Sequence, residues 1–240
     1  ITPELLMAEY ELADYIVVQS SFCHETFVDN GIAPDRLVLV SQGVDREKFR
    51  PGQKEDGVFR ALFVGSLNLR KGVRYLLEAW AQLQLDHAEL VLVGVIHDHV
   101  QPILRPYLGM RGLKLQGYVK DPVSLYQQAS VFILPSLVEW SAKVIYEAMA
   151  CGLPVIVTPN AGAEIRDGVE GFIIPARDVQ GLKEKLLFFY ENEKRRQAMG
   201  VAARAFAEQF PWERRGSLLL SAYQAVLERR GRSGQFVRVE

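Results

Sequence analysis

Two glutamates, Glu139 and Glu147, stand eight residues apart in a stretch whose pattern is typical of a ligand site. Residues 131–134 are apolar on both faces, which predicts a buried parallel strand. Residues 142–150 are rich in helix formers, so Glu139 is expected on the loop after the strand and Glu147 about two turns into the next helix. Ligands of open α/β sheets bind beside the carboxyl ends of the strands, where helix N-termini offer N–H groups to anions. The spacing therefore predicts a site for a ligand that carries phosphate.

A second group of charged residues, Arg70 and Lys71, follows the apolar run at 59–64 and precedes Gly72. Basic residues in the first turn of a helix oppose its dipole, so they are unfavourable there unless an anion is close. The pair is expected to contact the same phosphate-bearing ligand. The alternative reading is that both residues simply open a helix on a solvated surface.

The composition excludes several classes of protein. The chain has 240 residues and a formal net charge of −1, so it offers no overall positive field for nucleic acid. No apolar run approaches the roughly 18 residues that cross a bilayer, and no signal peptide is expected. Two cysteines far apart favour a reducing compartment. We expect a cytoplasmic protein, and contact with a membrane surface stays open.

No metal site is expected. His97 and His99 flank an aspartate, but no third ligand stands nearby at useful spacing, so a solvated loop is the better interpretation.

Strand and helix patterns alternate along almost the whole chain. Such alternation predicts βαβ units, and hence a Rossmann-like parallel sheet with helices on both faces. Expected strands lie at 15–18, 37–40, 59–64, 90–93, 113–115, 131–134, 154–157 and 172–174, and expected helices at 21–30, 73–85, 125–128, 179–190, 194–209 and 212–229.

One boundary is visible in the sequence. Residues 43–57 are polar and rich in turn formers, which indicates a linker between domains. Residues 1–42 are too few for a domain, so we expect them to be the end of one whose remainder is missing. Residues 58–210 are predicted to form the complete domain, 211–229 a C-terminal helix and 230–240 a polar tail.

Seven short motifs stand in one order along the chain: Gln42-Gly-Val-Asp45, Val64-Gly-Ser-Leu-Asn-Leu-Arg-Lys-Gly72, Gly117-Tyr-Val119, Pro135-Ser-Leu-Val-Glu139, Glu147-Ala-Met-Ala-Cys-Gly-Leu-Pro154, Gly162-Ala-Glu164 and Gly168-Val-Glu-Gly171. In these motifs the chain resembles the C-terminal half of a GT-B-fold retaining glycosyltransferase of family 4, over nearly all of residues 8–228. Any one motif alone would be weak evidence, whereas seven in order are specific.

The resemblance implies transfer of a hexose, with retention, from a nucleotide-diphosphate sugar to an unidentified acceptor, with no cofactor and no metal. It implies catalytic roles for Glu139, Arg70 and Lys71, and ribose binding by Glu147. The donor-binding residues that it implies are Gly65, Ser66, Arg70, Lys71, Tyr118, Val119, Trp140, Ser141, Ala142, Lys143, Val144 and Glu147. The sequence does not separate UDP-, GDP- and ADP-linked donors. In this family the acceptor site comes from the N-terminal domain, so the chain alone is expected to be inactive.

Two positions depart from the family pattern. Ser66 stands where an arginine is frequent, and Trp140 stands where a glycine is usual. The bulky indole could narrow the sugar pocket, stack on the sugar or point away. A non-catalytic nucleotide-sugar-binding module, in which Trp140 fills the sugar pocket, therefore stays open as an alternative. A GT-B nucleotide-sugar epimerase is a second alternative, because it shares the architecture.

Overall fold

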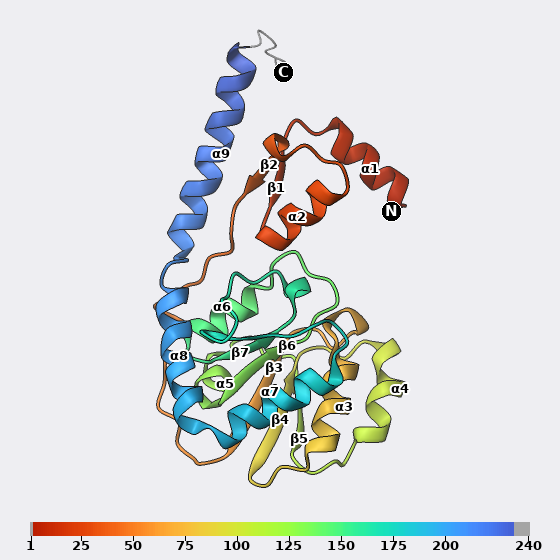
Figure 1. The fold of residues 1–240 in the computed structure, drawn as a ribbon, viewed down its shortest axis with the longest axis vertical. Helices are drawn as coiled ribbons and strands as arrows, with labels where there is room; N and C mark the ends of the chain where they lie inside the picture. The colour runs from red at the N-terminus through yellow and green to blue at the C-terminus, as the bar shows by residue number, and fades with distance from the viewer. Residues whose placement is uncertain (1, 233–240) are drawn as a thin grey trace.

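The structure is a computed structural model, and it describes residues 2–232 (Figure 1). Its strands are β1 (Ile16–Val18), β2 (Leu37–Leu39), β3 (Phe59–Val64), β4 (Ala88–Val93), β5 (Leu113–Gly117), β6 (Val131–Leu134), β7 (Val155–Val157) and β8 (Gly171–Ile173). Its α-helices are α1 (Pro3–Leu12), α2 (Ser21–Asp29), α3 (Val73–Leu83), α4 (Gln101–Leu104), α5 (Val123–Gln128), α6 (Lys143–Ala150), α7 (Val179–Glu191), α8 (Glu193–Ala207) and α9 (Trp212–Arg232).

The larger sheet is parallel throughout and has the strand order β5-β4-β3-β6-β7-β8. From β3 the chain moves outward to β4, and from β6 it moves outward in the opposite direction to β7. Because β3 and β6 are neighbours, the loops that leave their carboxyl ends diverge and open a crevice between them. This topological switch point is where ligands of doubly wound sheets bind.

Helices cover both faces of this sheet, as predicted. Right-handed crossovers in opposite directions place α3 and α6 on opposite faces. Helix α3 packs against α7, and α6 packs against α8. The fold is therefore the predicted Rossmann-like α/β domain.

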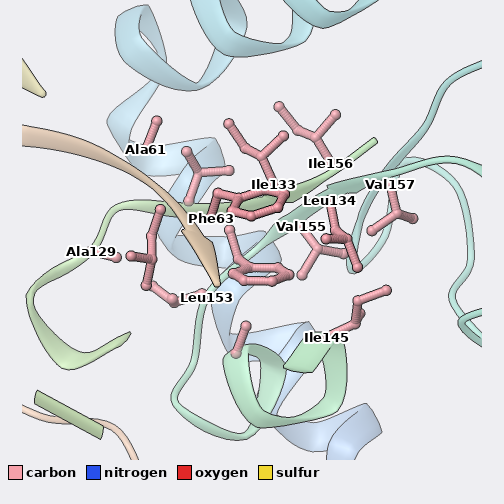
Figure 2. Close-up of a cluster of buried hydrophobic side chains, with 14 of the residues drawn as sticks. Ala61, Phe63, Ala129, Ile133, Leu134, Ile145, Leu153, Val155, Ile156 and Val157 are labelled. Carbon is pink, nitrogen blue, oxygen red and sulfur yellow. The ribbon is translucent and has the colours of Figure 1, made fainter. Parts of the chain in front are cut away.

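The core lies between the sheet and these helices. Figure 2 shows part of it, where Phe63 of β3, Ile133 of β6 and Ile156 of β7 pack together from neighbouring strands. These three side chains are fully buried. A strand buried on both faces is apolar at every position, which is why continuous apolar runs predict this sheet well.

The N-terminal segment forms a separate small unit. Strands β1 and β2 pair in parallel, and α2 packs against both. The unit has its own buried cluster around Val18 and Cys23, and Tyr10 of α1 packs against it. Helix α9 extends away from the large domain beside this unit (Figure 1), and Arg215 donates to the carbonyl of Val40. The division into domains at residues 43–57 stays a prediction.

The bounds of the elements differ from prediction in a few places. The strands agree within two residues, but α1 and α4 had no sequence signal. Helix α9 runs to Arg232, three residues beyond its predicted end, and the rest of the predicted polar tail lies outside the described residues. Glu147 is the fifth residue of α6, so it lies just over one turn into the helix and not two.

A glycine joins the Arg70–Lys71 turn to helix α3. Gly72 has φ 71°, and a Cβ added there would lie 2.0 Å from the carbonyl oxygen of Pro135 in the neighbouring loop. We expect Gly72→Ala to lower the free energy of unfolding by about 2–4 kcal/mol, because it combines left-handed backbone strain with steric overlap. Urea denaturation checks this. Gly57→Ala, whose Cβ would meet no atom within 4 Å, is the control. Equal midpoints for the two variants would contradict the prediction.

Candidate active site

The predicted catalytic residues meet at the switch point. Lys71 follows β3, and Glu139 follows β6. The Lys71 ammonium lies 2.7 Å from Oε1 of Glu139, and the Arg70 guanidinium lies 3.8 Å from the same oxygen. The side chains of Lys71 and Glu139 are only 12% and 10% exposed, whereas Arg70 is 51% exposed. The site therefore combines a nearly buried ion pair with a second cation at its open side.

Backbone contacts hold the two loops together. Asn68 begins the short 3-10 turn Leu69–Lys71, and its side-chain oxygen accepts from the Lys71 N–H at 3.0 Å. The Leu137 N–H donates to the Arg70 carbonyl at 2.7 Å. Since the turn is capped and fastened to the opposite loop, Lys71 is positioned by the backbone as well as by Glu139.

Glu147 is buried and held at both carboxylate oxygens. The hydroxyl of Tyr126 in α5 donates to Oε2 at 3.0 Å, and the Lys143 ammonium lies 3.2 Å from Oε1. Tyr126 is fully buried, and burial followed by the Glu147 charge raises its pKa well above the usual value. The phenol therefore stays a donor at neutral pH. A carboxylate oxygen has about two acceptor positions, so Glu147 keeps one on each oxygen for a ligand.

The remaining predicted residues before Glu147 lead into α6, which begins at Lys143. Ser141 and Ala142 are buried, Val144 is partly buried and Lys143 opens the helix. The Ala142 N–H donates to the carbonyl of Ala161, which fixes the loop. The Ile145 N–H donates to the Ala142 carbonyl at 3.0 Å. The N–H groups of Lys143 and Val144 have no carbonyl one turn earlier in the helix, so this end of α6 can receive an anion.

Trp140 turns toward the N-terminal unit. Its carbonyl accepts from the Ser20 hydroxyl at 2.6 Å and from the Cys23 thiol at 2.9 Å. Its ring lies beside that of Phe27 in α2, with 6.1 Å between centroids, and the residue is 47% exposed. The indole therefore lies between the large domain and the N-terminal unit, beside the ring of Phe27.

Of the other predicted residues, Gly65 lies beside the site, and the rest differ in their burial. A Cβ on Gly65 would lie 3.8 Å from Cε of Lys71, so this glycine lies beside the lysine side chain. Ser66 is partly buried, Val119 packs partly against the core, and Tyr118 is 73% exposed.

Glu139 and Glu147 line different hollows. The hollow that we name the Glu139 cavity measures about 320 Å³ and is bounded by α1, α2 and residues 138–140. The Glu147 pocket, also about 320 Å³, is bounded by α6, by residues 45–49 and 120–122, and by Trp212. The two carboxylates therefore line separate hollows of the site.

Sequence reasoning missed two contacts of the site. Tyr126 reaches Glu147 from 21 positions away, and Glu164 accepts from the Ser21 N–H at the start of α2 at 2.7 Å. Both join elements that only the folded chain brings together, so no local pattern could have indicated them.

Two further observations concern metals and membranes. Among residues 2–232 no group of three or more His, Cys, Asp or Glu side chains could hold a metal ion, and metal independence stays a prediction. No helix within the described part of the chain has the length and apolarity to span a bilayer.

Comparison with known proteins identifies the family. The family model described as glycosyl transferases group 1 matches residues 58–192. A D-inositol 3-phosphate glycosyltransferase of Kribbella flavida is 29% identical over 91% of this chain and 58% of its own length. An uncharacterized glycosyltransferase of Methanocaldococcus jannaschii is 26% identical over 84% of this chain and 57% of its own length. The chain thus spans between half and two thirds of the length of these curated relatives.

Solved structures agree on the fold. Anabaena HepE in complex with UDP and glucose superimposes with a TM-score of 0.83 at 20% identity, covering 94% of this chain and 68% of that protein. The sucrose-phosphate synthase of Thermosynechococcus elongatus gives 0.83 at 21% identity, covering 95% and 62%. The protein belongs to the group 1 glycosyl transferases, and its large domain is a Rossmann-like half of a GT-B fold.

Proposed function

We propose that this chain is the donor-binding half of a retaining glycosyltransferase that moves a hexose from a nucleotide-diphosphate sugar to an acceptor hydroxyl. The observation that carries the proposal is the meeting of Arg70, Lys71 and Glu139 at the switch point between β3 and β6. A diphosphate needs cations and free N–H groups. The basic turn and the start of α6 offer both.

In the proposed reaction the bond between the anomeric carbon and the diphosphate oxygen breaks, and a bond to the acceptor oxygen forms on the same face of the sugar. The acceptor proton passes to the departing diphosphate. Lys71 and Arg70 stabilise the charge that grows on the leaving group. Glu139, beside them, faces the positive charge that develops at the anomeric carbon.

Glu147 would bind the ribose. Its two oxygens can each accept a hydroxyl of a vicinal diol, and such charge-assisted bonds are strong. The nucleobase is proposed to lie against residues 117–119. Because HepE was crystallised with UDP and glucose, UDP is the first nucleotide to test.

Calorimetric titration of the chain with UDP, GDP and ADP tests donor binding. We expect one of the three to bind, and Glu147→Ala and Lys71→Ala each to weaken its binding. Equal affinity in the wild type and both variants would count against the site.

Tyr126 is expected to be a positioning residue for Glu147. Tyr126→Phe keeps the buried ring but removes the hydroxyl that orients Oε2. We expect the affinity for UDP to fall about three- to tenfold, the value of one hydrogen bond. The affinity for 2′,3′-dideoxy-UDP, which lacks the diol, should not change.

Tyr190→Phe is the control, since the Tyr190 hydroxyl donates to the Asp86 carbonyl away from the site. If Tyr126→Phe weakens both nucleotides equally, the hydroxyl does not act through the ribose.

A further inference from the structure

The Glu139 cavity has no assigned role in the proposed function. The residues that line it are Met7, Tyr10, Phe22, Cys23, Thr26, Phe27, Asn30, Ile32, Val138, Glu139 and Trp140. Most are apolar, and of the described residues that line it none carries a positive charge. Its volume of about 320 Å³ falls within the range of small-molecule sites.

Three polar side chains of the cavity wall, Cys23, Thr26 and Asn30, already donate hydrogen bonds. The Thr26 hydroxyl donates to the Phe22 carbonyl and the Asn30 amide to the Thr26 carbonyl, both at 2.8 Å within α2. The Cys23 thiol donates to the Trp140 carbonyl, and burial raises its pKa, so it stays protonated. These three side chains therefore offer few further donors to a ligand rich in hydroxyls. An apolar group would lose nothing by entering.

Aromatic rings shape the cavity. Tyr10 of α1 and Phe27 of α2 meet edge to face at 4.9 Å between centroids, and Phe27 continues to the ring of Trp140. Met7 and Trp140 remain 40% and 47% exposed. A concave surface lined mostly by apolar and aromatic side chains is the usual form of a small-molecule site.

The cavity is continuous with the candidate sugar site through Glu139, which lines it and also pairs with Lys71. An acceptor that presents its hydroxyl to a sugar beside Glu139 would extend into this space. Resting on the proposed function, we infer that the acceptor carries an apolar alkyl or aryl group close to the hydroxyl that is glycosylated, and that the Glu139 cavity binds this group.

A series of alkyl glucosides from methyl to hexyl, used below their critical micelle concentrations, tests the inference by ligand-observed NMR with and without UDP. Burial of a methylene favours binding about two- to fourfold. The dissociation constant should fall by that factor for each added methylene until the cavity is filled. A dissociation constant that does not depend on chain length would overturn the inference.

Two variants locate the effect. Phe27→Ser enlarges the cavity and makes it polar, and Thr26→Trp fills it from an exposed position on α2. Both should abolish the dependence on chain length while the affinity for UDP stays within about twofold. Leu220→Ser, at a 59% exposed position on α9, should change neither. If the dependence survives in both cavity variants, the alkyl group binds elsewhere and the inference is wrong.

Further outcomes separate this inference from the proposed function. Lys71→Met should weaken the binding of UDP but keep the chain-length dependence that is seen in the arm without UDP. Failure of the wild type to bind any nucleotide would contradict the proposed function even if the alkyl group still bound. A dimer in sedimentation that Thr26→Trp dissociates would show that a second copy occupies the cavity, and would overturn the inference.

Discussion

Glu147→Gln is expected to lower the affinity for UDP by about 10- to 100-fold, since each hydrogen bond to a charged group contributes about 1.5–3 kcal/mol. The amide keeps the shape of the side chain but offers one oxygen in place of two. That oxygen cannot serve both Tyr126 and the full ribose diol. The amide NH₂ would also face the Lys143 ammonium, which lies 3.2 Å from Oε1 of the glutamate. Calorimetric titration measures the loss.

The matched control is Glu89→Gln. Glu89 is a partly buried glutamate whose carboxylate lies 2.7 Å from Nε of Arg60, away from the switch point. It should keep the affinity for UDP of the wild type while losing some stability. A second comparison uses 2′,3′-dideoxy-UDP, which should bind Glu147→Gln and the wild type equally. A loss of affinity for both nucleotides would indicate that Glu147 supports the fold and does not bind ribose.

The central strands were predictable because burial on both faces makes most of their positions apolar. Phe59–Val64 and Val131–Leu134 match their predicted bounds for this reason. Helix α1 was not predicted because most of its residues are exposed, so no apolar stripe marks it in the sequence. Helix α4 was not predicted because it has only four residues, one of them Pro102. Their positions depend on tertiary contacts that a local pattern does not encode.

The candidate site was predictable to a similar degree and for a different reason. The carboxyl ends of parallel strands lie at one edge of the sheet, so Arg70, Lys71 and Glu139, which each follow a predicted strand, could be expected at that edge. Their pairing, the hydroxyl of Tyr126 on Glu147 and the direction of Trp140 could not. These features depend on which side chains face each other across α5, α6 and the N-terminal unit. Such pairs are far apart in the sequence and follow no helix or strand periodicity, so a local pattern cannot predict them.

Variants of the Lys71–Glu139 ion pair are expected to affect the stability of the fold and the affinity for UDP in different ways. Lys71→Met leaves a nearly buried carboxylate with only Arg70 at 3.8 Å, and Glu139→Gln leaves the ammonium without its partner. We expect each to lower the free energy of unfolding by about 1–3 kcal/mol, less than for a fully buried pair because solvent and Arg70 compensate in part. The double variant should regain most of that loss, since a removed pair leaves no unpaired charge. Urea denaturation measures all three.

The affinity of these variants for UDP should follow a different order from their stability. Lys71→Met and the double variant are both expected to lose about 10- to 100-fold in affinity for UDP, because the charge on the diphosphate loses its buried cation. Glu139→Gln should stay within about threefold, since UDP lacks the sugar that Glu139 faces. Arg111→Met removes one partner of an exposed pair, 78% and 70% open to solvent, and should change neither property. If the double variant recovered its affinity for UDP along with its stability, Lys71 would be a structural partner of Glu139, and the diphosphate would bind elsewhere.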